Sequence, residues 1–505
     1  MAYTYKAPQR DQVFLLPPSI ADWLPEDHLV WFVLDVISMV DLTEFHKAHP
    51  NDGVGRRAYD PEMMLALLFF SYCTGLRSSR RIEAAVRSDL AFKAICCDLV
   101  PDHIAIARFR ADHEAAITGA FIDILGLCAR AGLVSLGTIA IDGTKIGSDA
   151  ALDCNRTESV IQAEVDRILH EARVTDETEE SEVSSGGNLP EVLAHRAGRL
   201  RRLRAALAEI ESERQVQEEK ERGQDARWNA EAKEGKRPRG PMPKRADRAV
   251  AKTEAELVAA VVRSEQAPST LAKLQASEQV TRATRSLKAA KRAAACADVD
   301  PEAQANTTDP ESRIMKTQSG WIQGYNAQAA VNEGQIVIAA SVTQDTNDVA
   351  QLLPMIEAII DRVARAGICE AIGTVLADAG YWSAPNATAP GPNRLIATTK
   401  DWKQRKAARE LGTTTGPAPQ GSSPLEAMEH RLRTPEGAAQ YAKRSYTVEP
   451  IFGQAKENRG FRRFMRRGLS AATSEWALIC ATSNVLKLYT HADGRSLADV
   501  VVTAT

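Results

Sequence analysis

The sequence lacks the features of a membrane or secreted protein. Its longest apolar run, residues 63–73, has 11 residues and is too short to cross a bilayer. Residues 1–10 contain no apolar signal-peptide region. The eight cysteines form no C-x-x-C pair, and Cys96 and Cys97 are adjacent, which does not suit a disulfide framework. We therefore expect reduced thiols, a cytoplasmic location and no membrane partner.

An excess of charge of either sign is also missing. Lys and Arg number 63 and Asp and Glu number 66, so the net charge is −3. A nucleic-acid-binding surface must therefore be local rather than spread over the whole protein. The nine histidines have no metal-ligand spacing. The composition, 44% apolar and 26% charged over 505 residues, is that of a globular protein of two or more domains.

Residues 1–135 are predicted to be helical, because segments such as 25–40 and 60–76 have apolar residues at helical spacing. Asp60-Pro61 has the pattern of an N-cap followed by proline at the first helical position. Short helices joined by tight turns favour a helix-turn-helix that docks on DNA. A helical packing domain with a solvated basic face is an equally good interpretation. The cations of this region are Arg77, Arg80, Arg81, Arg108 and Arg110.

The composition changes twice in the following residues. Residues 136–146 are β-rich and predict a core strand that ends at Asp142-Gly143. Residues 156–305 are rich in Ala, Arg, Glu and Lys and predict a charged helical insertion, interrupted at 236–244. The spacing of four apolar residues in it is that of a coiled-coil or helical-hairpin seam: Leu200, Leu203, Leu207 and Ile210. Four cations there form either a solvated face or a contact with DNA or a second subunit: Arg199, Arg201, Arg202 and Arg204.

Strand signals return after residue 315. Residues 324–332 and 335–343 predict a hairpin, and 348–367 predict an amphipathic helix. Residues 371–378 predict a buried strand that ends in Asp378, and 393–400 one more strand. This order predicts an α/β fold with a mixed sheet.

Three carboxylates stand out from this plan. Asp142 and Asp378 each follow an apolar run, and Glu449 lies in an apolar setting inside a basic stretch. An Asp at a strand end is more often a cap or turn former, but two in one sheet beside a Glu favour a site. Clustered carboxylates repel, and divalent cations remove that repulsion. Two such ions can activate a hydroxyl and stabilise a leaving oxygen at phosphorus.

Other residues have weaker signals. Lys145 and Lys316 are as well explained by solvation as by phosphate contacts. Trp321 or Tyr381 could stack on an unpaired base, although packing is the more common role. Asp348 is best interpreted as the cap of the helix 348–367.

The chain resembles the DDE transposases of bacterial insertion sequences, in the group with N-terminal transposase-domain helices and a charged insert in the core. The resemblance rests on the order and joint occurrence of seven segments: 57–83, 101–110, 139–146, 308–317, 324–332, 376–383 and 441–468. It implies an RNase H-like catalytic core with Asp142, Asp378 and Glu449 as the catalytic and metal-binding triad. It also implies a Tyr-Arg-Glu-Lys signature, matched in type by Tyr441, Arg444, Glu449 and Lys456. Four residues separate Arg444 from Glu449, where the family usually has three.

The resemblance implies Mg²⁺, with Mn²⁺ as a substitute, and two ions. The implied partners are double-stranded DNA, as terminal inverted repeats and target, and a second copy of the chain in a synaptic homodimer associated with the nucleoid. The expected layout is a helical DNA-binding domain at 1–135, core at 136–155 and 306–490, an insertion at 156–305 and a tail at 491–505. The expected DNA-binding residues are Tyr441, Arg444, Lys456, Arg462, Arg463, Arg466, Arg467, Lys145, Arg80, Arg81, Arg108 and Arg110.

Two other functions stay open at this point. An RNase H-like nuclease would cleave without joining strands. A catalytically inactive DNA-binding protein from a decayed element would bind without cleaving.

Overall fold

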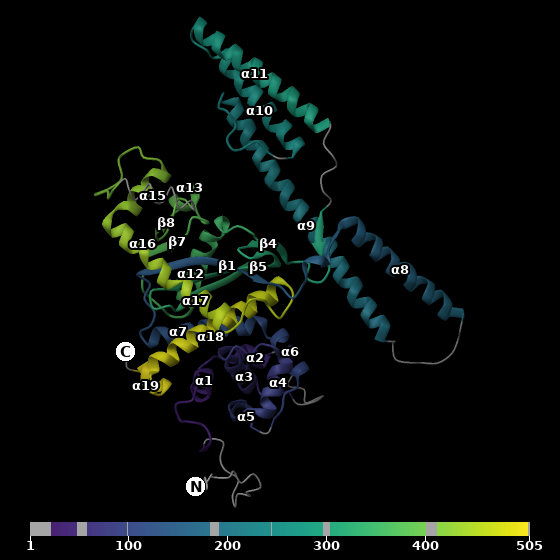
Figure 1. The fold of residues 1–505 in the computed structure, drawn as a ribbon, viewed down its shortest axis with the longest axis vertical. Helices are drawn as coiled ribbons and strands as arrows, with labels where there is room; N and C mark the ends of the chain where they lie inside the picture. The colour runs from purple at the N-terminus through teal and green to yellow at the C-terminus, as the bar shows by residue number, and fades with distance from the viewer. Residues whose placement is uncertain are drawn as a thin grey trace, which may run out of the picture. The chain divides into compact units, whose positions relative to one another are not determined.

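The computed structural model describes residues 22–47, 58–97, 99–181, 191–243, 245–295, 303–399 and 412–502. The chain forms two compact units (Figure 1). The first joins Met1–Leu152 to Ser312–Thr505, and the second is Asp153–Glu311. The second unit extends a few residues beyond each bound expected for the insertion, 156 and 305. None of the described helices is both long and apolar enough to cross a membrane.

The first unit begins with a group of helices around α3. Asp60 caps α3 by accepting a hydrogen bond from the backbone N–H of Glu62, and Pro61 opens the helix, which confirms the predicted start. Helix α3 is apolar on every side and almost wholly buried, as expected for the centre of a helical group. The helices are α1 (Leu29–Ser38), α2 (Thr43–Lys47), α3 (Pro61–Cys73), α4 (Ser79–Ser88), α5 (Leu90–Cys96), α6 (His103–Asp112) and α7 (Glu114–Arg130).

A mixed sheet forms the other half of this unit. Its order is β4-β5-β1-β7-β8, and β6 pairs with the part of β5 that β4 leaves free. Strand β1 is antiparallel to β5 and parallel to β7, which is parallel to β8. The mixed α/β plan predicted from the sequence is confirmed. The strands are β1 (Thr138–Gly147), β4 (Arg313–Thr317), β5 (Gly320–Asn332), β6 (Val337–Thr343), β7 (Thr374–Ala377) and β8 (Asn393–Ile396).

Strand β1 is longer than predicted. It does not end at Asp142-Gly143 but continues to Gly147, so Asp142 lies in its middle. Polar residues can continue the strand because they face polar partners on β5, where Gly143 is level with Gln328 and Lys145 with Asn326. The prediction that Asp142 ends the strand was therefore wrong.

Helix α18 connects the helical group to the sheet and lies between them in Figure 1. Its Trp476 donates a hydrogen bond of 2.8 Å to the carbonyl of Gln328 on β5. Its Asn484 bonds both backbone groups of Val337 on β6. The helical group and the sheet therefore share one core. The C-terminal helices are α12 (Leu352–Arg365), α13 (Ala384–Thr388), α15 (Pro424–Arg433), α16 (Pro435–Thr447), α17 (Glu449–Gly453), α18 (Leu469–Ala492) and α19 (Leu497–Val502).

In its described residues, the second unit contains four helices and a two-stranded ribbon. Leu203 and Ile210 of α9 are buried against Ile161 and Val165 of α8, which confirms the predicted apolar seam. Helices α10 and α11 pack along each other. The elements are β2 (Asn155–Thr157), α8 (Glu158–Ser181), α9 (Glu191–Lys233), α10 (Ala246–Glu265), α11 (Thr270–Ala295) and β3 (Gln304–Asn306), with β2 antiparallel to β3.

The close approach of β1 and β5 at Gly324 gives a test of this packing. A Cβ atom on Gly324 would lie 2.2 Å from the carbonyl oxygen of Ile146, so Gly324→Ala requires a backbone shift. We expect it to lower the free energy of unfolding by about 2 kcal/mol in urea unfolding. Gly119→Ala, in the open interior of α7, is the matched control and should be neutral or slightly stabilising. Equal stabilities of the two variants would contradict the strand register.

Candidate active site

Two of the predicted carboxylates lie on neighbouring strands. Asp142 is in the middle of β1, and Asp378 directly follows β7. The two strands are parallel, with Ile141 level with Ala377, so the next residue along each strand is an acid. The two carboxylates are close enough for their charges to repel.

Glu449 reaches the same place from the C-terminal helices. It begins the short helix α17 and is separated from α16 only by Val448. Arg444, near the end of α16, connects it to β1. Nη2 of Arg444 lies 2.6 Å from Oδ2 of Asp142, and Nη1 lies 3.5 Å from Oε1 of Glu449. One guanidinium thus bridges two of the three acids, and all three interact with it.

The environment of Asp142 disfavours its ionised form. Burial raises the pKa of Asp142 from an ordinary 3.8 to about 6, against the effect of Arg444, and the charges of Asp378 and Asp348 raise it further. The desolvation of this carboxylate therefore outweighs its ion pair. Positive charge brought to this place would stabilise the ionised acids.

Asp348 is a fourth carboxylate of this region, and its predicted role was wrong. It precedes the 3₁₀ turn Val349–Gln351, but its side chain makes no capping hydrogen bond there. Instead its Oδ1 accepts hydrogen bonds from Asn326 at 2.7 Å and Gln328 at 2.9 Å, with Nζ of Lys145 at 3.5 Å. The sequence signal for this arrangement is the pair of polar residues two apart in β5, Asn326 and Gln328, which face the same side of the strand.

Gly143 has no side chain, and this leaves room on β1 for the side chains of Gln328 and Asp348. A Cβ atom on Gly143 would lie 2.3 Å from Nε2 of Gln328 and 2.7 Å from Oδ1 of Asp348. Because side chains alternate along a strand, these groups lie on the face of β1 opposite the Asp142 side chain. A buried polar layer therefore packs against β1 on the face opposite Asp142.

Two family models match the chain. The N-terminal match is to "Transposase domain (DUF772)" over residues 18–112. The C-terminal match is to "Transposase DDE domain" over residues 399–489, which include Arg444 and Glu449. No match was found among curated proteins or among solved structures.

The two matches together support a DDE transposase of the insertion-sequence type. The DDE domain supports an enzymatic activity, DNA transposition, and DNA is therefore a partner. This family in general uses divalent metal ions. The family match agrees with the resemblance from which the three acids were predicted, although Asp142 and Asp378 lie outside the matched residues.

The transposase offers oxygen donors suited to Mg²⁺ or Mn²⁺ at Asp142, Asp378 and Glu449. As the side chains stand, no three acidic, histidine or cysteine groups in the described ranges are close enough to hold an ion. The Arg444 guanidinium accounts for this spacing, because it occupies the space between Asp142 and Glu449. The donor set fits such an ion in its chemistry.

The cations of residues 443–467 are less free than the sequence suggests. Arg459 is buried and donates to Thr482 and Ser483, and Arg466 pairs with Glu114 of α7. The remaining pairs are Lys443 with Glu333, Arg462 with Glu457, and Arg463 and Arg467 with Asp149. The exposed pairs are weak enough to exchange an acid for a phosphate, whereas Arg459 and Arg466 are structural.

Two other residues of the Tyr-Arg-Glu-Lys signature, Tyr441 and Lys456, form hydrogen bonds with the strands that carry the acids. Lys456, in a π-helical turn after α17, donates to Thr144 and to the carbonyl of Lys145, and burial lowers its pKa. The hydroxyl of Tyr441 donates a hydrogen bond of 3.4 Å to the carbonyl oxygen of Ala377. Both residues therefore fix α16 and the turn after α17 onto β1 and β7, next to the acids.

The predicted DNA-binding arginines of the helical group differ in exposure. Arg80, Arg81 and Arg108 are exposed and have no acidic partner among the described residues. Arg110 is buried, donates to the hydroxyl of Tyr72, and is attracted to the buried Glu475. The placement of Arg110 does not support the DNA contact predicted for it.

The two aromatic residues considered for base stacking, Tyr381 and Trp321, differ in their exposure to solvent. Tyr381 is fully buried and donates to Gln328, which suits packing rather than base stacking. Trp321 is 59% exposed on β5, level with the exposed Lys316 of β4. Only Trp321 of the two is available to a ligand.

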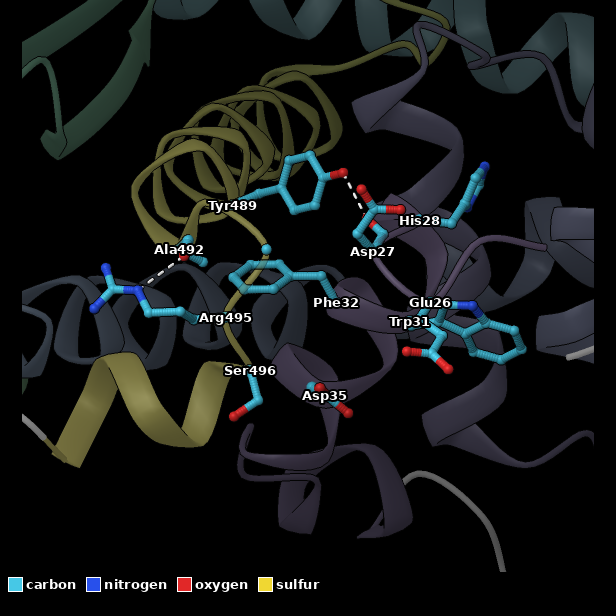
Figure 2. A pocket seen from close by; sticks show the side chains of 11 residues that line it. Glu26, Asp27, His28, Trp31, Phe32, Asp35, Tyr489, Ala492, Arg495 and Ser496 are labelled. Carbon is cyan, nitrogen blue, oxygen red and sulfur yellow. Dashed lines mark hydrogen bonds between the residues drawn. The ribbon is translucent and has the colours of Figure 1, made fainter.

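A pocket lies elsewhere, between α1 and the end of α18 (Figure 2). It has a volume of about 610 Å³, and Tyr489 crosses it to donate to the carbonyl of Asp27. Its lining includes Asp35, whose pKa is raised by burial, and Arg495. Asp142, Asp378 and Glu449 are not among the residues that line this pocket.

The raised pKa of Asp142 predicts a pH effect on stability. Below pH 4 the carboxyl is protonated in both the folded and unfolded protein. Between pH 4 and pH 6 the unfolded protein releases this proton first, so the free energy of unfolding falls by about 3 kcal/mol as pH rises. Urea unfolding with EDTA at pH 4.5 and pH 7 should reveal about 2 kcal/mol of this fall in the wild type relative to Asp142→Asn. Asp361→Asn, which removes an exposed acid, is the control. Its free energy of unfolding should fall by the same amount as that of the wild type between the two pH values.

Arg110 and Arg108 predict opposite phenotypes. Arg110→Ala leaves the buried Tyr72 and Glu475 without their cation and should lower the free energy of unfolding by about 3 kcal/mol. Arg108→Ala should change stability by less than about 0.5 kcal/mol while lowering the salt slope of DNA binding by about 1. Thermal melting and fluorescence anisotropy measure the two effects. A stable Arg110→Ala variant would contradict the buried network.

Proposed function

We propose that the transposase hydrolyses the phosphodiester bond at each end of its element and joins the released 3′-hydroxyl to target DNA. Asp142, Asp378 and Glu449 act together as the catalytic acids. The observation that carries this proposal is the convergence of the three acids on Arg444 from β1, the end of β7 and α17.

The acids would hold the divalent cations that the family uses, with Mg²⁺ proposed as the ion, Mn²⁺ as its substitute and two ions at the site. The bound ions supply activation of a water or 3′-hydroxyl and stabilise the departing oxygen. Arg444 must then release Glu449, since its guanidinium lies between that residue and Asp142. Once released, Arg444 is beside the acids and can contact a DNA phosphate.

The DNA ends would bind across the helical group and the basic segment. Arg80, Arg81 and Arg108 are the exposed cations through which the helices bind the inverted repeats. Arg462, Arg463 and Arg467 exchange their surface acids for phosphates, which sets register rather than sequence. Two copies of the chain would hold two ends in the synaptic complex.

Strand transfer in vitro tests this proposal. Purified protein, Mg²⁺ and duplex DNA bearing the element ends should give joined products with the wild type. Asp142→Asn, Asp378→Asn and Glu449→Gln should each lower the joining rate at least about 10³-fold without losing DNA binding. Asp361→Asn, a surface acid of α12, is the matched control and should join at the wild-type rate.

The products also separate the alternatives. Cleaved ends without joined strands would favour a nuclease. Wild-type joining by any one of the three variants would remove that acid from the catalytic set.

A further inference from the structure

The helix α11 of the second unit has an unbalanced charge. It carries six cations and one acid, Glu278, whereas its partner α10 carries three cations and four acids. From residue 279 to the end of α11 the sequence contains five cations and no acid. The second half of α11 is therefore a local concentration of positive charge.

Four of these cations form a single stripe. Their spacing of three, three and four residues places them on one face of a helix over a length of roughly 15 Å. The stripe consists of Arg282, Arg285, Lys288 and Arg292, all exposed. The half-buried residues of the same segment lie on the opposite face: Ala283, Leu287, Ala290 and Ala294. The stripe thus points away from the face by which α11 packs on α10.

Within the part of the chain that the structure describes, the stripe cations have no acidic partner. Lys291, which is off the stripe, pairs with Glu254 of α10 at 2.9 Å. The four stripe residues form no ion pair with any acid that the structure describes in this unit. In the basic segment 443–467, by contrast, every cation has an acceptor within the protein.

We propose that this α11 stripe binds the phosphate backbone of duplex DNA as a second DNA contact of the transposase. A row of cations about 15 Å long, unpaired among the described residues, matches the regular charge of a duplex, and such contacts need no particular base sequence. A second copy of the chain would bring two like-charged stripes together, which is unfavourable. The proposal depends on DNA being the substrate and not on the catalytic roles of the three acids.

Equilibrium binding to a 40-base-pair duplex of arbitrary sequence tests the stripe. The full-length protein is titrated in EDTA at several NaCl concentrations, and anisotropy gives the affinity. A variant with Arg282, Arg285, Lys288 and Arg292 changed to Gln should bind at least about tenfold more weakly near 150 mM salt. The slope of log affinity against log salt should become shallower by roughly 3 to 4.

The control variant removes the same number of charges from the same unit. Arg167, Arg214, Arg237 and Arg245, all paired with acids, are changed to Gln. Affinity and salt slope within about twofold of wild type are expected, and thermal melting checks that both variants fold. Equal DNA binding by the two variants would overturn the proposal.

Two further readouts separate other occupants of this face. Leu271 and Leu274, at the start of α11, are 67% and 64% exposed and are available to a protein partner. Sedimentation that shows loss of self-association in the stripe variant, with DNA binding unchanged, would overturn the proposal in favour of a second copy. Because binding is measured without divalent ions, failure of the catalytic assignment would leave this result interpretable.

Discussion

The bridge from Arg444 to Asp142 and Glu449 is the interaction on which the site depends. Asp142 lies on the central strand, beside Asp378, in a place where burial alone disfavours its charge. The ionised form of Asp142 in this place is stabilised by a cation close by. Arg444 provides that cation and, in doing so, fixes the junction of α16 and α17 over β1. The same bridge holds Glu449 close to β1, although the two are about 300 residues apart in the chain.

The helical group and the sheet act as one body because α18 packs on both. Trp476 and Asn484 tie it to β5 and β6, while its other side packs on α3 and α7. The backbone of residues 462–464 bonds to Gly147 at the end of β1, and Arg77 donates to the carbonyl of Arg463. DNA bound on the N-terminal helices would therefore have a fixed position relative to the acids.

The parts of the molecule predictable from the sequence were those set by apolar pattern. The seam of α9, the start of α3 and the buried strands β5 to β7 follow from spacing and caps. The prediction for Asp348 failed because an acid before a helix has a local explanation, whereas its hydrogen bonds come from a strand 20 residues earlier.

Charge was the least predictable property, for a similar reason. Arg459 and Arg462 look alike in the sequence, yet one is buried in α18 contacts and the other exposed. The acid that neutralises Arg466 is Glu114, more than 350 residues away in the chain. The number of cations in a segment predicts the charge of its surface only when the cations that pair with acids are left out. Which cations are paired is known only from the folded structure.

The most direct test of the central claim is anomalous diffraction from crystals grown with Mn²⁺. The account predicts Mn²⁺ ligated by Asp142, Asp378 and Glu449, with the Arg444 guanidinium displaced from Glu449. Crystals that bind Mn²⁺ elsewhere, or that retain the Arg444 bridge with no ion at the three acids at saturating Mn²⁺, would contradict it.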